Sequence, residues 1–150
     1  GHPSGIMSLG RIWEVAVDCY LTQWAVDRGG CYLIDVEQER DGIIASLDGV
    51  LVIPDGSFAP CGLAVAETKL RFSLKDDIPV RHLQQTRAYC HLLDTDLCCY
   101  VSCHLSSIPP TAEASLRVIR FTRESIEETW EGLVKTKNYL EGCGCGPGVG

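Results

Sequence analysis

The sequence predicts one α/β domain in which a mixed β-sheet is flanked by helices. Apolar residues recur at helical spacing in three separate stretches, near both ends and in the middle of the chain. Between them lie segments rich in β-branched residues and bounded by Gly, Asp and Pro, which is typical of strands and turns. The nearly all-apolar run at residues 97–105 indicates a strand buried on both faces. A length of 150 residues fits a single domain with one core.

Composition and charge narrow the function only in part. Hydrophobic residues make up 45% of the chain, and no apolar run approaches the roughly 18 residues that span a bilayer, so we expect no membrane partner. We also find no secretory signal, which favours an intracellular protein in the cytoplasm, or in the nucleus or host cell if it is viral. The formal net charge is −7, yet residues 69–123 carry 8 basic and 5 acidic side chains, so DNA remains a compatible partner.

The first predicted helix covers residues 8–28 and ends at a Gly-Gly pair. Residues 1–7 precede it and are interpreted as an expression-tag remnant or a disordered N-terminus, which leaves residues 8–141 as the domain. Glu14 lies at the margin of the apolar stripe, either as a solvated residue or as a carboxylate that reaches over the sheet toward a metal ion. The stripe itself consists of Leu9, Trp13, Ala16, Val17, Tyr20, Leu21 and Trp24.

Two strands joined by a tight turn follow this helix. Residues 31–40 are rich in Tyr, Leu, Ile and Val, as expected of a strand. The dipeptide Asp41-Gly42 is a strong signal for a two-residue hairpin loop. We therefore expect residues 31–40 to pair with residues 43–53.

Asp48 lies in the middle of the second of these strands. An ionised group is rare in such an apolar run unless it is paired or binds a metal. In the alternative interpretation, Asp48-Gly49 is itself a type I′ turn. Turn signals before residue 43 and at residues 54–56 already bracket a strand of ordinary length. They favour the strand interpretation, with a bend or bulge at Gly49.

The next predicted strand, residues 63–69, places Glu67 and Lys69 on one side, because side chains alternate between the two faces of a strand. A carboxylate and an ammonium group are therefore expected next to each other. The alternative is an exposed ion pair at a strand end, which contributes about 0–1 kcal/mol and has no functional meaning.

Residues 78–93 predict a helix on which Arg81, Gln85 and Tyr89 recur every four residues and form one stripe. Such a stripe can hold a phosphate backbone. In the alternative interpretation, the Arg and Gln side chains are solvated and Tyr89 packs at the edge of the core.

The remainder of the chain predicts two strands, a helix and a tail. The strands cover residues 97–105 and 115–121, and Thr122 caps the final helix. The apolar stripe of that helix consists of Ile126, Trp130, Leu133, Val134 and Leu140. Residues 142–150 are rich in Gly and Cys, and we expect them to form a flexible tail.

Three elements occur in an order that resembles the PD-(D/E)xK nuclease superfamily. Asp48 followed by Glu67-Thr68-Lys69 resembles the motif that gives the superfamily its name. The spacing of Gln85 and Tyr89 resembles the Q-x-x-x-Y element of the branch with RecB-type and lambda-exonuclease-type nucleases, and residues 10–14 resemble its G-x-x-x-E element. The resemblance implies a restriction-endonuclease-like αβββαβ core. The first helix lacks the histidine found there in some RecB-type relatives.

The resemblance also implies a reaction and its residues. It implies hydrolysis of DNA phosphodiester bonds, more in the manner of an exonuclease than an endonuclease, with Mg²⁺ or Mn²⁺ as cofactor. The expected metal ligands are Glu14, Asp48, Glu67 and the carbonyl of Thr68, and the expected catalytic residues are Asp48, Glu67 and Lys69. Gln85 and Tyr89 would position the DNA strand, and we add Arg81 as a phosphate contact.

Two further possibilities remain open at this stage. One is a nucleic-acid-binding or assembly module that keeps the nuclease fold without cleavage. The other is self-association, since a short chain with little beyond its core would need further copies or a partner for processive action.

Nine cysteines are many for 150 residues. Seven lie in apolar surroundings and are expected in the core: Cys19, Cys31, Cys61, Cys90, Cys98, Cys99 and Cys103. Cys143 and Cys145 in the tail could bind a soft metal or form a cross-link, as in a zinc or redox protein. Some relatives with the Q-x-x-x-Y element hold an iron–sulfur cluster with one cysteine before the core and three after it. Only two follow the last predicted helix, so we expect no cluster.

Overall fold

The computed structural model describes residues 5–54, 56, 61–71, 77–107 and 110–143. Its elements occur in the order predicted from the sequence and confirm the α/β class. They are α1 (Gly5–Asp27), β1 (Cys31–Arg40), β2 (Ile43–Val52), β3 (Leu63–Arg71), α2 (Val80–Leu93), β4 (Leu97–Ser107), β5 (Pro110–Arg120) and α3 (Arg123–Gly142). Within the described ranges, no helix is long and apolar enough to cross a membrane.

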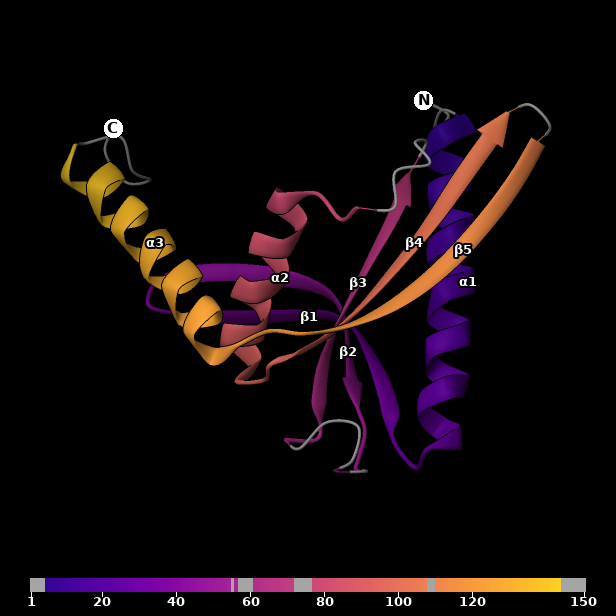
Figure 1. Ribbon diagram of the computed structural model, residues 1–150, viewed down its shortest axis with the longest axis horizontal. Helices are drawn as coiled ribbons and strands as arrows, with labels where there is room; N and C mark the ends of the chain where they lie inside the picture. Colours follow the sequence, from indigo (N-terminus) through magenta and orange to yellow (C-terminus); the bar gives the residue numbers. More distant parts are fainter. Residues whose placement is uncertain (1–4, 55, 57–60, 72–76, 108–109, 144–150) are drawn as a thin grey trace.

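The five strands form one mixed sheet in the order β1-β2-β3-β4-β5. Strands β3 and β4 are parallel, and helix α2 makes the crossover between them; the other neighbouring strands are antiparallel. Helix α1 covers one face of the sheet, while α2 and α3 lie on the other (Figure 1). The sheet is therefore the middle layer of three, as the predicted mixed sheet with flanking helices requires.

Each face of the sheet has its own hydrophobic core. The core under α1 includes Val17, Leu21, Ala25, Leu51, Ile53, Ala64, Ala66, Cys99 and Val101. The core under α2 and α3 includes Leu47, Val50, Val65, Cys90, Cys98, Tyr100, Phe121 and Ile126. Neighbouring residues of β3 and β4 thus enter opposite cores, which explains why their sequences are almost continuously apolar.

The β1–β2 hairpin forms at the dipeptide predicted for it. Asp41 and Gly42 have φ angles of 55° and 76°, as a type I′ turn demands of both central residues. The hairpin is tied to α3, because the Trp130 indole Nε1 donates a hydrogen bond of 2.8 Å to Asp41 Oδ2. The Trp130 ring in turn stacks on His91 of α2, with 4.5 Å between ring centroids.

Strand β2 separates from β3 at Asp48. The described pairing of these strands begins at Val52 with Leu63 and ends at Gly49 with Ala66. The two strands of the hairpin are also distorted at this level, where Asp35 of β1 has a φ of 52°. The interpretation of Asp48-Gly49 as a turn is wrong, since both residues lie within β2. Figure 1 shows that the β1–β2 hairpin bends along its length.

Gly49 is required at this bend. A Cβ atom at this position would overlap the ring of Tyr32, which packs over the glycine from β1. Tyr32 is buried, so its ring has little room to move aside. The glycine next to Asp48 therefore lets the first strand pack against the point where the sheet opens.

Several boundaries and burial states differ from the sequence prediction. Helix α1 begins at Gly5, inside the segment interpreted as a remnant, and residues 1–4 lie outside the described part. The Thr122 cap is confirmed, since its side chain accepts a hydrogen bond of 3.2 Å from the Ser125 backbone N–H. Residue 55 of the predicted turn at residues 54–56 and residues 144–150 of the predicted tail lie outside the described residues.

The cysteine prediction is confirmed for some residues and wrong for others. Cys90, Cys98 and Cys99 are buried, as predicted, because they lie on central elements of the sheet and on the inner face of α2. Three are exposed: Cys19 lies on the outer side of α1, Cys31 at the start of β1, and Cys61 in the turn before β3. The side chain of Cys103 and all of Cys145 lie outside the described residues.

Candidate active site

The Asp48 side chain of β2 contacts Thr68 of β3 at the point where the two strands separate, next to Glu67. The Thr68 backbone N–H donates a hydrogen bond of 3.1 Å to Asp48 Oδ2, and the Thr68 hydroxyl lies 3.3 Å from the same oxygen. In a continuing antiparallel ladder, a β2 carbonyl would accept from β3 at this level. Here the Asp48 side chain accepts this hydrogen bond in place of the backbone carbonyl. Its carboxylate therefore lies against β3 where the two strands diverge.

Glu67 and Lys69 form a close ion pair on the α2 side of β3. Lys69 Nζ lies 2.9 Å from Glu67 Oε1, as expected from their shared face. The Glu67 side chain is only 2% exposed and that of Lys69 is 26% exposed. The interpretation as an exposed surface pair is therefore wrong, because the carboxylate is buried in the sheet.

Glu67 is buried beside a second carboxylate. Burial and the negative charge of Asp48 raise the pKa of Glu67 to about 7, although Lys69 opposes the shift. Glu67 Oε2 is buried and has no hydrogen-bond partner among the described residues. The neighbouring Asp48 carboxylate brings no positive charge to this oxygen.

A chain of hydrogen bonds extends from this pair to α2. Lys69 Nζ lies 3.4 Å from Gln85 Oε1, and the Gln85 amide donates a 2.7 Å bond to the Tyr89 hydroxyl. Burial, followed by the charge of Glu67, raises the pKa of Tyr89, which keeps this hydroxyl protonated. Gln85 and Tyr89 thus face the site, whereas Arg81 lies exposed one turn before Gln85.

A small acidic pocket lies on the α1 side of Asp48. It measures about 180 Å³, and its lining consists of Glu14, Asp18, Ile34, Asp35, Asp48 and Thr68. Glu14 was predicted from the sequence, and the structure brings it to the pocket that Asp48 shares. Glu67 lies outside this lining, so Glu14 and Glu67 approach Asp48 from different sides.

Sequence reasoning missed two carboxylates of this pocket, Asp18 and Asp35. Asp18 follows Glu14 by one helical turn, which is the signal that could have identified it. Asp35 reaches the pocket through its left-handed backbone conformation, for which β1 gives no clear signal. Burial raises the pKa of Asp18, and the charges of Asp35 and Asp48 add to the shift. The pocket therefore concentrates negative charge next to Asp48.

The residues present fit a hard divalent cation with a partial protein shell. In the described part of the chain, no three His, Cys, Asp or Glu side chains are grouped closely enough to form a ready-made ligand cluster. Mg²⁺ commonly uses one or two carboxylates and keeps several waters. Asp48 and the unpartnered Oε2 of Glu67 provide such a pair, and a cation would relieve the repulsion that raises the pKa of Glu67.

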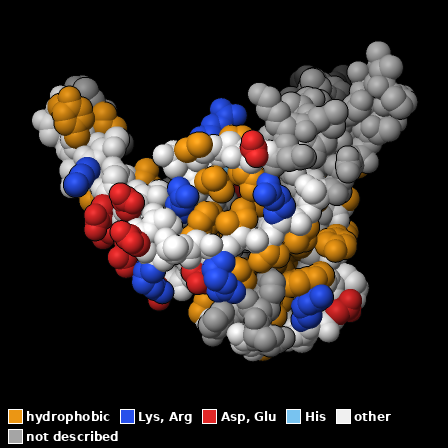
Figure 2. Space-filling view, in the orientation of Figure 1, with side chains coloured by type: hydrophobic (Ala, Val, Ile, Leu, Met, Phe, Trp, Pro, Cys, Tyr) orange, Lys and Arg blue, Asp and Glu red, His pale blue; other side chains and the backbone are white. Residues whose placement is uncertain are grey.

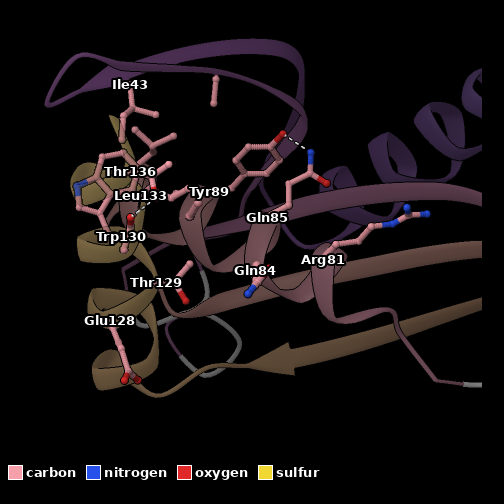
Figure 3. A pocket seen from close by; sticks show the side chains of 14 residues that line it. Ile43, Arg81, Gln84, Gln85, Tyr89, Glu128, Thr129, Trp130, Leu133 and Thr136 are labelled. Carbon is pink, nitrogen blue, oxygen red and sulfur yellow. Dashed lines mark hydrogen bonds between the residues drawn. The ribbon is translucent and has the colours of Figure 1, made fainter. Parts of the chain in front are cut away.

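A larger groove lies on the opposite side, between α2, α3 and the start of β2. Its volume is about 760 Å³, and its lining includes Arg81, Gln85, Tyr89, Trp130 and Leu133. Figure 3 shows Gln85 and Tyr89 hydrogen-bonded to each other, with Trp130 and Leu133 on the α3 side and Arg81 at the far end from α3. All three residues of the predicted helical stripe therefore border one groove.

Comparisons with known proteins identify the fold and nothing more specific. No protein-family model matches the sequence, and the search of curated proteins found no match. The chain is similar to the solved structure named "Crystal structure of SSO0001", with a TM-score of 0.53 and 15% sequence identity. The similarity covers 89% of this chain and 62% of that one, so this chain spans less than two thirds of the other.

Proposed function

We propose that this domain is a divalent-metal-dependent nuclease of the PD-(D/E)xK type that hydrolyses DNA phosphodiester bonds. One observation carries the proposal. Glu67 is buried with one oxygen paired to Lys69 at 2.9 Å, while the other oxygen lacks a donor and Asp48 lies beside it. An ion pair with a purely structural role needs no second carboxylate. A site that binds a metal ion beside an ammonium group does need one.

Each residue has a role that follows from its surroundings. Asp48, Glu67 and the Thr68 carbonyl would hold Mg²⁺ or Mn²⁺, with Glu14 as a further ligand from the adjoining pocket. When bound, the ion supplies an activated water and neutralises charge on the phosphate. Lys69 orients the attacking water and stabilises negative charge that develops on the phosphate oxygens.

The α2 side of the site positions the substrate. Gln85 and Tyr89 orient Lys69 through their hydrogen-bond chain and contact the DNA strand next to the scissile phosphate. Arg81 contacts a neighbouring phosphate. Action from strand ends, as in an exonuclease, rests on the family resemblance alone.

A second candidate function is a nuclease-fold module that binds nucleic acid or assembles with a partner without cleavage. The observation that favours it is the lack of a ready-made cluster of three metal-binding side chains within the described residues. The two candidates differ in metal binding, because a binding module has no need for a cation at Asp48 and Glu67.

Incubation with linear, circular and single-stranded DNA, with and without Mn²⁺, tests the proposal. We expect Mn²⁺-dependent cleavage by the wild type that is lost in both Asp48→Asn and Lys69→Ala. Lys135→Ala, which removes an exposed lysine of α3, is the matched control and should cleave normally. Circular dichroism verifies that the variants are folded. Equal cleavage by all four proteins would reject the residue assignments, and no cleavage by the folded wild type would favour the binding module.

A further inference from the structure

The groove between α2 and α3 has the size and composition of a ligand site. Its 760 Å³ lies within the range of about 300–1,000 Å³ that is typical of small-molecule pockets. Ile43, Ala45, Ala88, Leu92 and Leu133 give it an apolar surface. The side chains of Gln84, Thr129 and Thr136 add groups at its margin that can form hydrogen bonds.

One wall of the groove is held rigidly before any ligand binds. Trp130 is buried, stacks on His91 and donates to Asp41, so its ring is fixed by two different elements. Arg40 of the hairpin also donates a 2.9 Å hydrogen bond to the His91 carbonyl. The groove is therefore largely pre-formed, which reduces the entropy lost on binding.

The charges at the ends of the groove are opposite. Arg81 lies at the end far from α3, whereas α3 contributes Glu128 at the other end (Figure 3). Figure 2 shows acidic side chains gathered over α3 and basic ones spread around the hydrophobic centre of this face. A phosphate is thus favoured near Arg81 and Lys69 and disfavoured near α3, while an uncharged group can occupy the middle.

We infer that this groove binds one unstacked nucleobase of a single-stranded DNA end, adjacent to the scissile phosphate. The inference rests on the proposed nuclease function and names its preferred substrate. Nucleobases combine flat apolar faces with edges that form hydrogen bonds. These properties match the apolar surface and the polar margin of the groove. The chain from Lys69 through Gln85 to Tyr89 links the phosphate position to the groove directly. Bases in an intact duplex are stacked and paired, so they cannot enter it.

Charge-matched variants of α3 test the inference. Leu133→Asp and Thr136→Asp place a carboxylate inside the groove, at positions exposed enough to tolerate it. Asn138→Asp places the same charge on an exposed part of α3 outside the lining. Fluorescence anisotropy in EDTA measures the binding of labelled oligothymidylate and of a blunt-ended hairpin duplex. Cleavage of both substrates with Mn²⁺ is measured in parallel.

We expect both groove variants to bind oligothymidylate about tenfold more weakly, the effect of losing about 1.4 kcal/mol of binding free energy. Their binding to the duplex and the binding of Asn138→Asp to both substrates should match the wild type. Wild-type cleavage with unaltered oligothymidylate binding by the groove variants would overturn the groove assignment alone. Absence of cleavage by the wild type would overturn the nuclease function and, with it, this inference.

Discussion

Two hollows lie on opposite faces of the sheet, with the Asp48–Glu67–Lys69 group between them. The pocket toward α1 is small and lined by four carboxylates, whereas the groove toward α2 and α3 is larger and mostly apolar. A bare acidic pocket repels a phosphate backbone, so DNA could approach it only with cations present. The apolar groove is not lined mainly by carboxylates, so DNA can approach it without added cations. Under the proposed function, one face would serve the cation and the other the nucleoside.

The largest expected effect comes from removing the carboxylate shared by the strands and the acidic pocket. Asp48→Asn keeps the acceptor for the Thr68 N–H but loses the negative charge for a cation. We expect Mn²⁺-dependent kcat to fall by about 10²-fold or more, the usual scale for loss of a group that stabilises transition-state charge. Steady-state kinetics measures this against Asp27→Asn, an exposed carboxylate at the end of α1. A decrease below threefold would mean that the acidic face has no catalytic role.

The stability of the metal-free protein should depend on pH through Glu67. Its pKa of about 7 in the folded state exceeds the ordinary 4.5, so the folded protein binds more protons between these pH values. The free energy of unfolding should therefore decrease as pH rises from about 4.5 to about 7 without metal. In Glu67→Gln the part of this decrease that Glu67 causes should vanish, so the wild type should lose about 3 kcal/mol more than the variant between pH 4 and pH 8. Urea denaturation at several pH values measures it; parallel curves for the two proteins would contradict the assigned burial.

The bend in β2, which lies between the acidic pocket and the apolar groove, depends on Gly49. The variant Gly49→Ala should lower the free energy of unfolding by about 1–3 kcal/mol, because the new methyl group overlaps the buried Tyr32 ring. Gly56→Ala is the control, since a Cβ atom there meets nothing within 4 Å. Urea denaturation distinguishes the two variants. Equal stability of both would show that Tyr32 can move aside and that the bend does not require glycine.

Asp18 gives the smallest expected effect. Its pKa is raised by burial and by the neighbouring carboxylates, so its charge destabilises the metal-free fold at neutral pH. We expect Asp18→Asn to be slightly more stable than the wild type at pH 7, by less than about 1 kcal/mol. Added Mn²⁺ should reduce this advantage if the cation lies near the acidic pocket. Thermal denaturation with and without Mn²⁺ measures both effects; destabilisation by the substitution would contradict the account of the pocket's charge.

The sequence predicted the helices and strands more accurately than it predicted the bend of the β1–β2 hairpin near Gly49. The bounds of β1 agree with the prediction because the hairpin dipeptide and the Gly-Gly pair mark its ends. The start of α1 at Gly5 was missed because residues 1–7 were interpreted as an expression-tag remnant or a disordered N-terminus. The bend at Gly49 was expected from the glycine, but the matching distortion at Asp35 depends on contacts between strands.

For the candidate site, sequence reasoning identified residues but not their surroundings. Alternation along β3 predicted that Glu67 and Lys69 share a face, and the ion pair confirms it. The burial of Glu67 depends on α2 and on β4, which lie far along the chain and cannot be inferred from local spacing. The same is true of Asp18, which joins the pocket only because α1 packs across β1 and β2.

Calorimetric titration of Mn²⁺ into the metal-free protein at pH 8 tests the central claim most directly. The account predicts binding at millimolar Mn²⁺ or below in the wild type, with the heat lost in Glu67→Gln and retained in the exposed control Glu141→Gln. A folded wild-type protein that binds no Mn²⁺ at millimolar concentration would contradict the cation site at Asp48 and Glu67.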